Sequence, residues 1–330
     1  MGDADHIEDA SNLFGPVAAD LAAIESGLRA LIAADPDVVS APMADLFEAG
    51  GKRIRPALVL LAARIGAYDL GRLTPAAIAV ELTHAATLVH DDVIDRATTR
   101  RGRPTVAARL GDEPAIVVGD FYFAKAYDQA ASTESPEVVT ILADAVMKIC
   151  AGEVRQQAIR HQYDATLDEY MSRIEAKTAT LLAACCDIGA LLGGLDTHAR
   201  PHLREYGRLL GLAFQIADDV LDYTGSEDEV GKPIGHDIAE GFATLPLMLA
   251  MDEPSVAERL SRLLRAGREL NAEHGADVVA IVRESRGPQR ALERARALAA
   301  DARRELEPLE GGEATRTLSA LTDYVVTRKL

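Results

Sequence analysis

Residues 84–95 read HAATLVHDDVID, and residues 214–222 read FQIADDVLD. Each stretch ends an apolar run with helical periodicity, and each contains the pattern D-D-x-x-D. On a helix that turns about 100° per residue, positions i, i+1 and i+4 fall within an arc of roughly 100°. Each stretch therefore predicts a helix with three aspartates on one patch near its C-terminal end. The aspartates are Asp91, Asp92 and Asp95 in the first motif, and Asp218, Asp219 and Asp222 in the second.

The chemistry of these two patches favours a divalent cation. Three carboxylates on one side of an apolar helix repel each other unless cations lie between them. A solvated helix end is the simpler alternative, but carboxylates at a helix C-terminus also oppose the helix dipole. Oxygen ligands with room for water suit Mg²⁺, which in such sites usually binds substrate phosphates. Two such patches facing each other would hold a cluster of Mg²⁺ ions.

Two basic segments indicate which anion would bind. Residues 50–56 read GGKRIRP, and residues 96–105 read RATTRRGRPT directly after the first motif. Glycine lets the backbone approach a ligand closely, and arginine can bind phosphate oxygens through two hydrogen bonds at once. A plain surface loop is the alternative for each segment. Because both segments accompany a predicted metal cluster in an acidic chain, we expect a diphosphate as the ligand.

Taken together, these motifs resemble those of the trans-polyprenyl diphosphate synthases, which elongate isoprenyl chains head to tail. In family order, the matching residues are GGKRIRP (50–56), HAATLVHDDVID (84–95), RRGRPT (100–105), GD (119–120), GExxQ (152–156), KT (177–178), FQIADDVLD (214–222) and GKPIGxD (231–237). The resemblance implies a prenyltransferase with an all-α fold, the type I isoprenoid synthase helical bundle around a central cavity. We expect a single domain over residues 1–330, with residues 1–14 as a disordered tail.

Composition agrees with a helical enzyme and argues against other classes. Of the 330 residues, 48% are hydrophobic, while aromatic residues make up 4% and Trp is absent. A net charge of −17 argues against nucleic acid as a partner. Three cysteines with an adjacent pair do not resemble a disulfide framework, which fits a reducing cytoplasm. No run of about 18 apolar residues predicts a transmembrane segment, although we expect weak membrane association during product release.

Periodicity and capping residues predict helices nearly end to end. They cover residues 15–33, 38–49, 53–66, 74–95, 113–133, 135–162, 166–193, 197–223 and 241–251, with three or four more helices over 254–330. Thr74 and Pro75 have the character of an N-cap and a first helical residue. No strand-like alternation competes with this pattern.

The resemblance implies roles for the metal-binding and catalytic residues. An allylic diphosphate would bind through about three Mg²⁺ ions between the two aspartate motifs. The implied metal ligands are Asp91, Asp92, Asp95, Asp218 and Asp222, with Asp219 in support. Arg100, Lys177 and Lys232 would bind the same diphosphate. The carbonyl of Lys177 or Thr178 and the side chain of Gln215 would stabilise the allylic cation.

The resemblance also implies a second, metal-free site for isopentenyl diphosphate. Its residues would be Gly51, Lys52, Arg55, His84 and Arg101, with Gln215 and Lys177 completing the substrate-binding set. By pattern alone, His84 would be a core histidine, and the family pattern does not direct Arg53 at a ligand. Ionisation of the allylic C–O bond, attack by the isopentenyl double bond and loss of a proton would lengthen the chain by one isoprene unit.

One position departs from the family pattern. After GKPIGHD at residues 231–237, the family commonly continues to G-K-x-T-x-P, whereas residues 241–246 read GFATLP. Phe242 therefore stands where a diphosphate-binding lysine is common, and this puts the third cation of that site in doubt.

The residues before the first aspartate motif bear on product length. Family members that stop early place bulky aromatic residues there. This chain has Ala86 and Thr87, with Val80 and Thr83 deeper on the same helix. We therefore expect a product of C20 or longer, with C30 to C50 in range.

Three other hypotheses stand beside the synthase. A purely structural helical repeat protein would need a period of about 20–50 residues, and the sequence shows none. A type I terpene cyclase shares the fold and the first motif, but it usually replaces the second motif with an N-S-E-like pattern. A non-catalytic partner subunit of a heteromeric synthase would typically lose aspartates or arginines. The intact motifs favour the active synthase, which we expect to be a homodimer.

Overall fold

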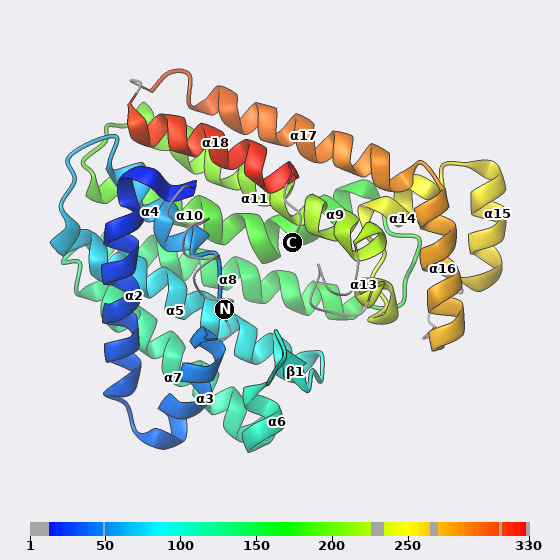
Figure 1. The fold of residues 1–330 in the computed structure, drawn as a ribbon, viewed down its shortest axis with the longest axis horizontal. Coiled ribbons are helices and arrows are strands. Elements are labelled where there is room, and N and C mark those ends of the chain that lie inside the picture. The colour runs from blue at the N-terminus through cyan, green and yellow to red at the C-terminus, as the bar shows by residue number, and fades with distance from the viewer. Residues whose placement is uncertain (1–12, 49, 226–233, 265–269, 310–311, 328–330) are drawn as a thin grey trace, which may run out of the picture. The chain divides into compact units, whose positions relative to one another are not determined.

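The computed structural model describes residues 13–48, 50–225, 234–264, 270–309 and 312–327. Most of these residues are helical, and the only strands among them form a short hairpin (Figure 1). The predicted all-α class is therefore confirmed. No helix within these ranges is both long and apolar enough to cross a membrane. The expected tail at residues 1–14 lies almost wholly outside them, although Phe14 is described and is buried.

The chain forms two compact units, each assembled from separate segments. The first unit takes residues 1–146, 181–207 and 305–321, and the second takes residues 147–180, 208–304 and 322–330. Helices α8 (Pro136–Ala158) and α11 (Ala199–Thr224) contribute residues to both units. The single domain expected over residues 1–330 stays a prediction.

The first unit is built around two buried helices, α4 (Ile54–Ala63) and α5 (Leu70–Ile94). The residues from Pro56 to Ala63 are all buried, as expected of a helix that is apolar on every side. Helix α5 packs against both α4 and α7. The other helical elements of this unit are η1 (Gly15–Val17), α2 (Ala18–Ala33), α3 (Asp37–Glu48), α6 (Val106–Leu110), α7 (Asp112–Ala131), most of α10 (Thr180–Leu192) and most of α18 (Glu313–Thr327).

Helix α5 begins one turn earlier than predicted. The Asp69 side chain caps it by accepting a hydrogen bond from the Gly71 N–H at 3.0 Å. Pro75, predicted as the first helical residue, therefore lies inside the helix. The prediction placed the cap at Thr74, because the Thr-Pro pair fits an N-terminus and Asp69 is the stronger cap.

The arginine loop after α5 contains a short hairpin, which the sequence analysis did not predict. Strands β1 (Thr99–Arg100) and β2 (Arg103–Pro104) pair antiparallel across a two-residue turn. Both turn residues have positive φ, 49° at Arg101 and 74° at Gly102. Turns of this kind match the twist of a hairpin. The strands are too short to be detected by alternation in the sequence.

The second unit combines the end of α8 with short helices and most of the C-terminal region. Its elements include α9 (Leu167–Ile174), the π-helical turn η2 (Glu175–Ala179), α13 (His236–Ala239), α14 (Leu245–Ala250), α15 (Pro254–Leu263), α16 (Ala272–Glu284) and most of α17 (Gly287–Glu305). The predicted continuous helix at 166–193 is therefore interrupted at η2. A core cluster is formed by Tyr223, Ile238, Ala243, Leu247, Ala250, Val256, Leu260, Val278, Ile281 and Val282.

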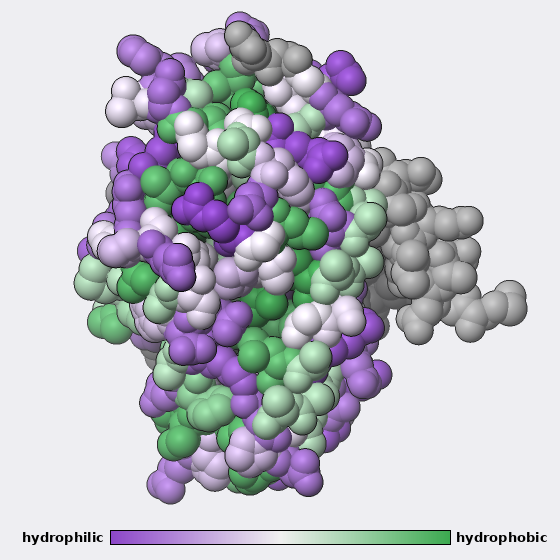
Figure 2. Space-filling model, turned by 90° about the vertical axis from the view of Figure 1, so that its left-hand side faces the viewer, coloured by the Kyte–Doolittle hydropathy of each residue, from purple (hydrophilic) through white to green (hydrophobic). Residues whose placement is uncertain are grey.

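The surface and the cysteines agree with the composition. Figure 2 turns the left-hand side of Figure 1 toward the viewer and shows hydrophobic residues lying between hydrophilic ones. The three cysteines are free thiols; Cys185 and Cys186 are buried in α10, and Cys150 is exposed.

Helices α4 and α10 approach each other closely at Gly189. A Cβ atom at this position would lie 2.2 Å from the Val59 carbonyl oxygen and 2.9 Å from the Ala62 Cβ. Contacts that short require the α4 backbone to move, so the glycine is required by packing.

We predict that Gly189→Ala lowers the free energy of unfolding by about 2 kcal/mol or more, because the added methyl group meets backbone rather than a flexible side chain. Gly275→Ala is the matched control, since Gly275 is also helical and a Cβ added there would meet nothing within 4 Å. The control should be as stable as the parent or up to about 1 kcal/mol more stable, through helix propensity. Urea unfolding followed by circular dichroism compares the two variants, and equal losses would refute the packing argument.

Candidate active site

The first aspartate motif lies at the C-terminal end of α5, where the chain enters the arginine hairpin. Asp92 is only 2% exposed and accepts a hydrogen bond from Arg100 Nε at 2.9 Å, with Arg100 Nη2 at 2.8 Å from the same oxygen. Burial raises the pKa of Asp92, and the guanidinium of Arg100 opposes this rise. Asp91 and Asp95 are half-buried. The hairpin therefore folds back to place a cation on the most buried aspartate of the motif.

The second aspartate motif lies at the C-terminal end of α11 and is organised in a similar way. Asp219 is 3% exposed and accepts hydrogen bonds from the Tyr170 hydroxyl at 2.6 Å and from Gln215 Nε2 at 2.9 Å. Asp222 is buried and accepts a hydrogen bond from the Asp237 N–H at 3.0 Å. Asp218 is half-buried.

The charge on Asp219 is only partly compensated by its neighbours. Burial is the main cause that raises the pKa of Asp219, and the charge of Asp237 adds to it. The hydrogen bonds from Tyr170 and Gln215 and the charge of Arg173 act in the opposite direction. A positive ion beside this carboxylate would therefore be stabilising.

The corresponding aspartates of the two motifs lie in similar environments. In each, the second aspartate is buried and held by protein donors, while the first is half-buried. Among the described residues, no group of three or more His, Cys, Asp or Glu side chains is gathered closely enough to hold a metal ion. The donors of both motifs are carboxylate oxygens, which is the ligand chemistry that fits Mg²⁺.

A hydrogen-bond chain links the predicted cation-stabilising residues to the second motif. Thr178 donates from Oγ1 to Gln215 Oε1 at 2.6 Å, and the Gln215 amide nitrogen donates to Asp219. These two hydrogen bonds fix the orientation of the Gln215 side-chain amide. Lys177 lies beside Glu153 of α8, with 3.5 Å between Nζ and Oε2.

The π-helical turn η2, which carries Lys177 and Thr178, is held by two close approaches. A Cβ on Gly152 of α8 would lie 2.5 Å from the Ala176 Cβ, and one on Gly211 of α11 would lie 2.5 Å from the Ala179 Cα. Single π-helical turns of this kind occur often at functional sites. The two glycines explain why η2 fits here, although the sequence pattern predicted an uninterrupted helix.

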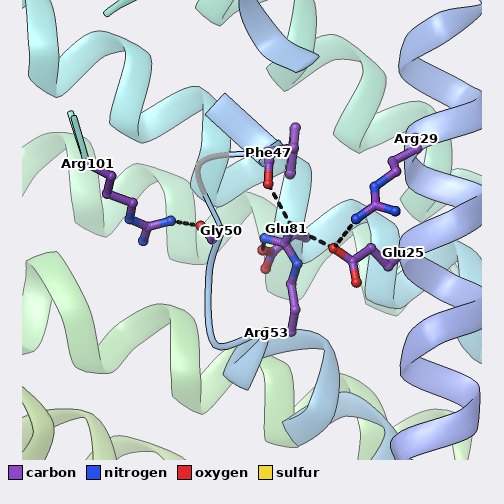
Figure 3. A network of polar contacts seen from close by, with 7 residues as sticks. All are labelled: Glu25, Arg29, Phe47, Gly50, Arg53, Glu81 and Arg101. Atoms are coloured by element: carbon purple, nitrogen blue, oxygen red, sulfur yellow. Dashed lines mark hydrogen bonds and ion pairs between the residues drawn. The ribbon is translucent and has the colours of Figure 1, made fainter. Parts of the chain in front are cut away.

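A network of ion pairs holds the loop before α4. Figure 3 shows Arg53, which has a positive φ of 48°, bonded to Glu81 of α5 at 3.0 Å and to Glu25 of α2 at 3.1 Å. Arg53 also donates to the Phe47 carbonyl at 3.2 Å, and Arg101 donates to the Gly50 carbonyl (Figure 3). Arg53 is therefore a structural residue of the loop.

Gly51 lies where two guanidinium groups come together. A Cβ on it would be 3.0 Å from Arg53 Nη1 and 3.4 Å from Arg101 Nη1. Arg55 is enclosed beside Glu81, and burial lowers the pKa of Arg55 while the Glu81 charge opposes the shift. Lys52 is half-buried. The loop and the hairpin thus bring their basic side chains into one region of the first unit.

The environment of His84 is strongly positive. Burial lowers the pKa of His84 well below its usual value, and four arginine charges lower it further. The four are Arg55, Arg101, Arg100 and Arg53, in order of effect. His84 is therefore a neutral imidazole at neutral pH, one ring nitrogen donating and the other accepting. A cluster of positive charge around a neutral, polar side chain is suited to an anion.

The residues predicted to set the product length lie on α5, before the first motif in the sequence. Val80, Thr83 and Ala86 are buried, and Thr87 is half-buried. The hydroxyl groups of Thr83 and Thr87 donate to carbonyls of their own helix, at Ala79 and His84. Because the hydroxyls are satisfied within the helix, both threonines can present methyl groups to an apolar ligand.

Sequence reasoning missed several residues of the site. Tyr170 donates to Asp219, Glu81 pairs with Arg53 of the basic loop, and Arg173 contacts the ring of Phe242, yet no motif singled out these three residues. A glutamate in the apolar run before His84 was a signal for Glu81, because a buried charge needs a partner. In the Gly119-Asp120 pair of the family pattern, the glycine has a packing role, because a Cβ on Gly119 would meet the ring of His90. The Nε2 atom of that ring lies 3.0 Å from the Ile116 carbonyl oxygen. Lys232 lies outside the described residues.

Comparison with known proteins agrees with this fold and these motifs. A family model described as polyprenyl synthetase matches residues 36–282. Heptaprenyl diphosphate synthase component 2 of Geobacillus stearothermophilus is 40% identical over 266 residues, which cover 81% of this chain and 82% of that protein. Nonaprenyl diphosphate synthase of Mycobacterium tuberculosis is 36% identical over 315 residues, covering 94% of this chain and 93% of that protein.

The solved structures place the fold in the same class. A polyprenyl synthase from Caulobacter crescentus, crystallised with calcium and isoprenyl diphosphate, superimposes with a TM-score of 0.91 at 36% identity, covering 97% of this chain and 98% of that chain. The fold is thus the all-α type I isoprenoid synthase fold, and the protein is a prenyltransferase of the polyprenyl diphosphate synthase type. The chain belongs to the polyprenyl synthetase family.

We predict that Arg53→Met lowers the free energy of unfolding by about 3 kcal/mol, because it leaves the carboxylate of Glu81 buried without its partner. The Arg53 and Glu81 side chains are 15% and 7% exposed. Arg29→Met is the matched control: Arg29 pairs with the same Glu25 but is 63% exposed, so its loss should cost no more than about 0.5 kcal/mol. Urea titration of both variants decides, and a loss at Arg53 no larger than at Arg29 would contradict a structural role.

Proposed function

We propose that the protein condenses an allylic prenyl diphosphate with isopentenyl diphosphate and releases inorganic diphosphate, giving a product of C20 or longer. The observation that carries this proposal is the basic cluster around the neutral His84, seven residues before Asp91 on the same helix. A terpene cyclase has no use for a second diphosphate site, so this cluster favours chain elongation over cyclisation.

The isopentenyl diphosphate site would consist of Gly51, Lys52, Arg55, His84 and Arg101. Arg55 supports this assignment, because its buried Nε has no hydrogen-bond partner within the part of the chain that the structure describes. A diphosphate there would satisfy buried donors and compensate the repulsion among the arginines. Neutral His84 would add a directional hydrogen bond without further charge. The Arg53 network would hold the loop in place for this contact.

The allylic diphosphate site would be formed by the two aspartate motifs with Arg100, Lys177 and Lys232. Asp91, Asp95 and Asp218 would hold about three Mg²⁺ ions, with Asp92, Asp219 and Asp222 binding or orienting through their buried hydrogen bonds. Bound Mg²⁺ supplies the positive charge that stabilises a departing diphosphate. Arg100, already fixed on Asp92, would add a donor directed at the same group.

The allylic cation would be stabilised by residues of η2 and α11. The carbonyl groups of a π-helical turn depart from the α-helical i→i+4 pattern, and the Lys177 or Thr178 carbonyl would face the developing charge. The Gln215 amide, oriented by Thr178 and Asp219, would contribute its oxygen dipole. The hydrocarbon chain must be kept from water, because water would capture the cation.

The product length follows from the small residues on α5. Val80, Thr83, Ala86 and Thr87 present no aromatic ring, so we propose that the growing chain runs along this helix to C20 or beyond. Relatives of this chain are named nonaprenyl and solanesyl diphosphate synthases, which agrees with a long product.

We further propose a homodimer in the cytoplasm that associates weakly with membranes when it releases its product. Helix α7 supports the dimer, because it exposes Ile116, Val117 and Phe121, and Val117 is 64% exposed. Large apolar side chains grouped on one exposed helix are typical of an interface. A non-catalytic partner role is the alternative, since one relative is named heptaprenyl diphosphate synthase component 2.

The test is to incubate the purified protein with Mg²⁺, isopentenyl diphosphate and each allylic diphosphate from C5 to C20, followed by chromatography of the products. Elongated diphosphates of C20 or longer are the expected result. A cyclic hydrocarbon formed without isopentenyl diphosphate would instead identify a terpene cyclase. Turnover only after addition of a second protein would identify a partner subunit.

We predict that Ala86→Phe shortens the main product to about C15 or C20, because a ring at this buried position would fill space that several carbons of the chain would occupy. Total turnover should be largely kept, since the diphosphate sites are untouched. Val38→Phe is the control, because Val38 lies on α3, is 66% exposed and belongs neither to the proposed path of the chain nor to the proposed dimer surface. An unchanged product from Ala86→Phe would mean that the chain follows another wall.

A further inference from the structure

We propose that Arg173 binds the allylic diphosphate and supplies the positive charge that the family pattern commonly places at position 242. This inference rests on the proposed function and concerns the second aspartate motif. Phe242 has no charge to offer, so the question is which cation takes the place of a lysine there.

Arg173 contacts two aromatic rings of the second unit. Its Nη2 donates to the Ala243 carbonyl at 2.8 Å. Its guanidinium carbon lies 5.6 Å from the centre of the Phe242 ring and 5.4 Å from that of the Tyr170 ring. Cation–π contacts and one hydrogen bond hold the flat group in place. Phe242 therefore acts as a support for an arginine, which a lysine at the same position could not do.

Arg173 lies close to the second aspartate motif. It contacts the ring of Tyr170, and the hydroxyl of that residue donates to Asp219 at 2.6 Å. Arg173 also stands four residues before Lys177, across the junction of α9 and η2. Arg173 and Lys177 are thus two cations on consecutive elements of the second unit.

Arg160 provides an internal comparison, because it contacts the same ring. Its guanidinium carbon lies 5.8 Å from the Phe242 ring centre. However, Arg160 forms an ion pair with the Glu240 carboxylate and donates to the Glu240 carbonyl at 2.7 Å. Arg173 has no carboxylate within ion-pair distance among the residues that the structure describes. Of the two arginines, Arg173 is therefore the one whose charge is left for a ligand.

The chemistry suits a diphosphate better than an isolated carboxylate. A guanidinium can donate two parallel hydrogen bonds to phosphate oxygens, whereas lysine acts as a point charge. One donor of Arg173 is used by the Ala243 carbonyl, which leaves others for the ligand. The arrangement predicts an effect on the allylic substrate and none on isopentenyl diphosphate, whose proposed site lies in the loop before α4.

The experiment compares steady-state kinetics of the full-length protein with geranyl diphosphate as the allylic substrate. We expect Arg173→Gln to raise the KM for geranyl diphosphate by about 10-fold or more, as loss of a charge-assisted hydrogen bond requires. The KM for isopentenyl diphosphate should change by less than about 2-fold. Arg160→Gln is the matched control and should leave both KM values within about 2-fold, because its charge is already neutralised.

Rescue separates a binding role from a structural one. Arg173→Gln combined with Phe242→Lys should recover most of the lost affinity, because it restores a cation at the family position, and Arg173→Lys should lose only a few-fold. Circular dichroism confirms that each variant is folded. Calorimetry with inorganic diphosphate and Mg²⁺ gives a readout that is independent of turnover.

Two results would overturn the assignment of Arg173: a KM for geranyl diphosphate unchanged in folded Arg173→Gln, or equal increases for both substrates. Absence of rescue by Phe242→Lys in a folded double variant, with binding of inorganic diphosphate unaffected by Arg173→Gln, would also refute it. Failure of the proposed function would look different, since the parent protein itself would then form no elongated product.

Discussion

The concentration of like charges at a few buried positions is the constraint on which the rest of this structure depends. Carboxylates gather at the C-terminal ends of α5 and α11, and arginines gather around His84. In a low-dielectric interior such groups destabilise the fold unless each has a partner. The structure supplies partners locally: Arg100 for Asp92, Tyr170 and Gln215 for Asp219, and Glu81 for Arg53. The arginine cluster keeps a net positive charge and the aspartate motifs keep a negative one, and under the proposed function a diphosphate with Mg²⁺ would complement both.

The scaffold keeps these charges in place through close helix packing. Gly189 brings α10 against α4, and Gly152 and Gly211 admit the π-helical turn η2 between their neighbours. A methyl group would meet backbone at Gly189 and Gly211 and the rigid Cβ of Ala176 at Gly152, so no flexible side chain could make room for it. Small residues therefore have a functional consequence here, because the carbonyls and side chains of η2 are positioned by the helices packed against it.

Much of the fold, and the position of both aspartate motifs at helix ends, could be predicted from the sequence, because the spacing of aspartates on a helix and the order of the motifs are local properties. The helical class and the first motif at the end of a long helix follow from periodicity. The start of α5 could not be predicted as well, since Asp69 and Thr74 both make plausible caps and the choice depends on tertiary packing. The turn η2 depends on glycines of two other helices. Glu81 and Arg173 could not be predicted, because their partners are distant in sequence. In the sequence alone, Phe242 is interpreted as the loss of a positive charge, since its contact with Arg173 is known only from the structure.

The most direct test of the central claim is calorimetric titration of inorganic diphosphate into the protein, with Mg²⁺ and with a chelator. If the aspartate motifs bind diphosphate through Mg²⁺, the affinity should rise on the order of 100-fold when the metal is present. The folded variant Asp91→Asn with Asp218→Asn should lose most of that gain. Equal affinity with and without Mg²⁺, or a gain that survives both substitutions, would contradict the account.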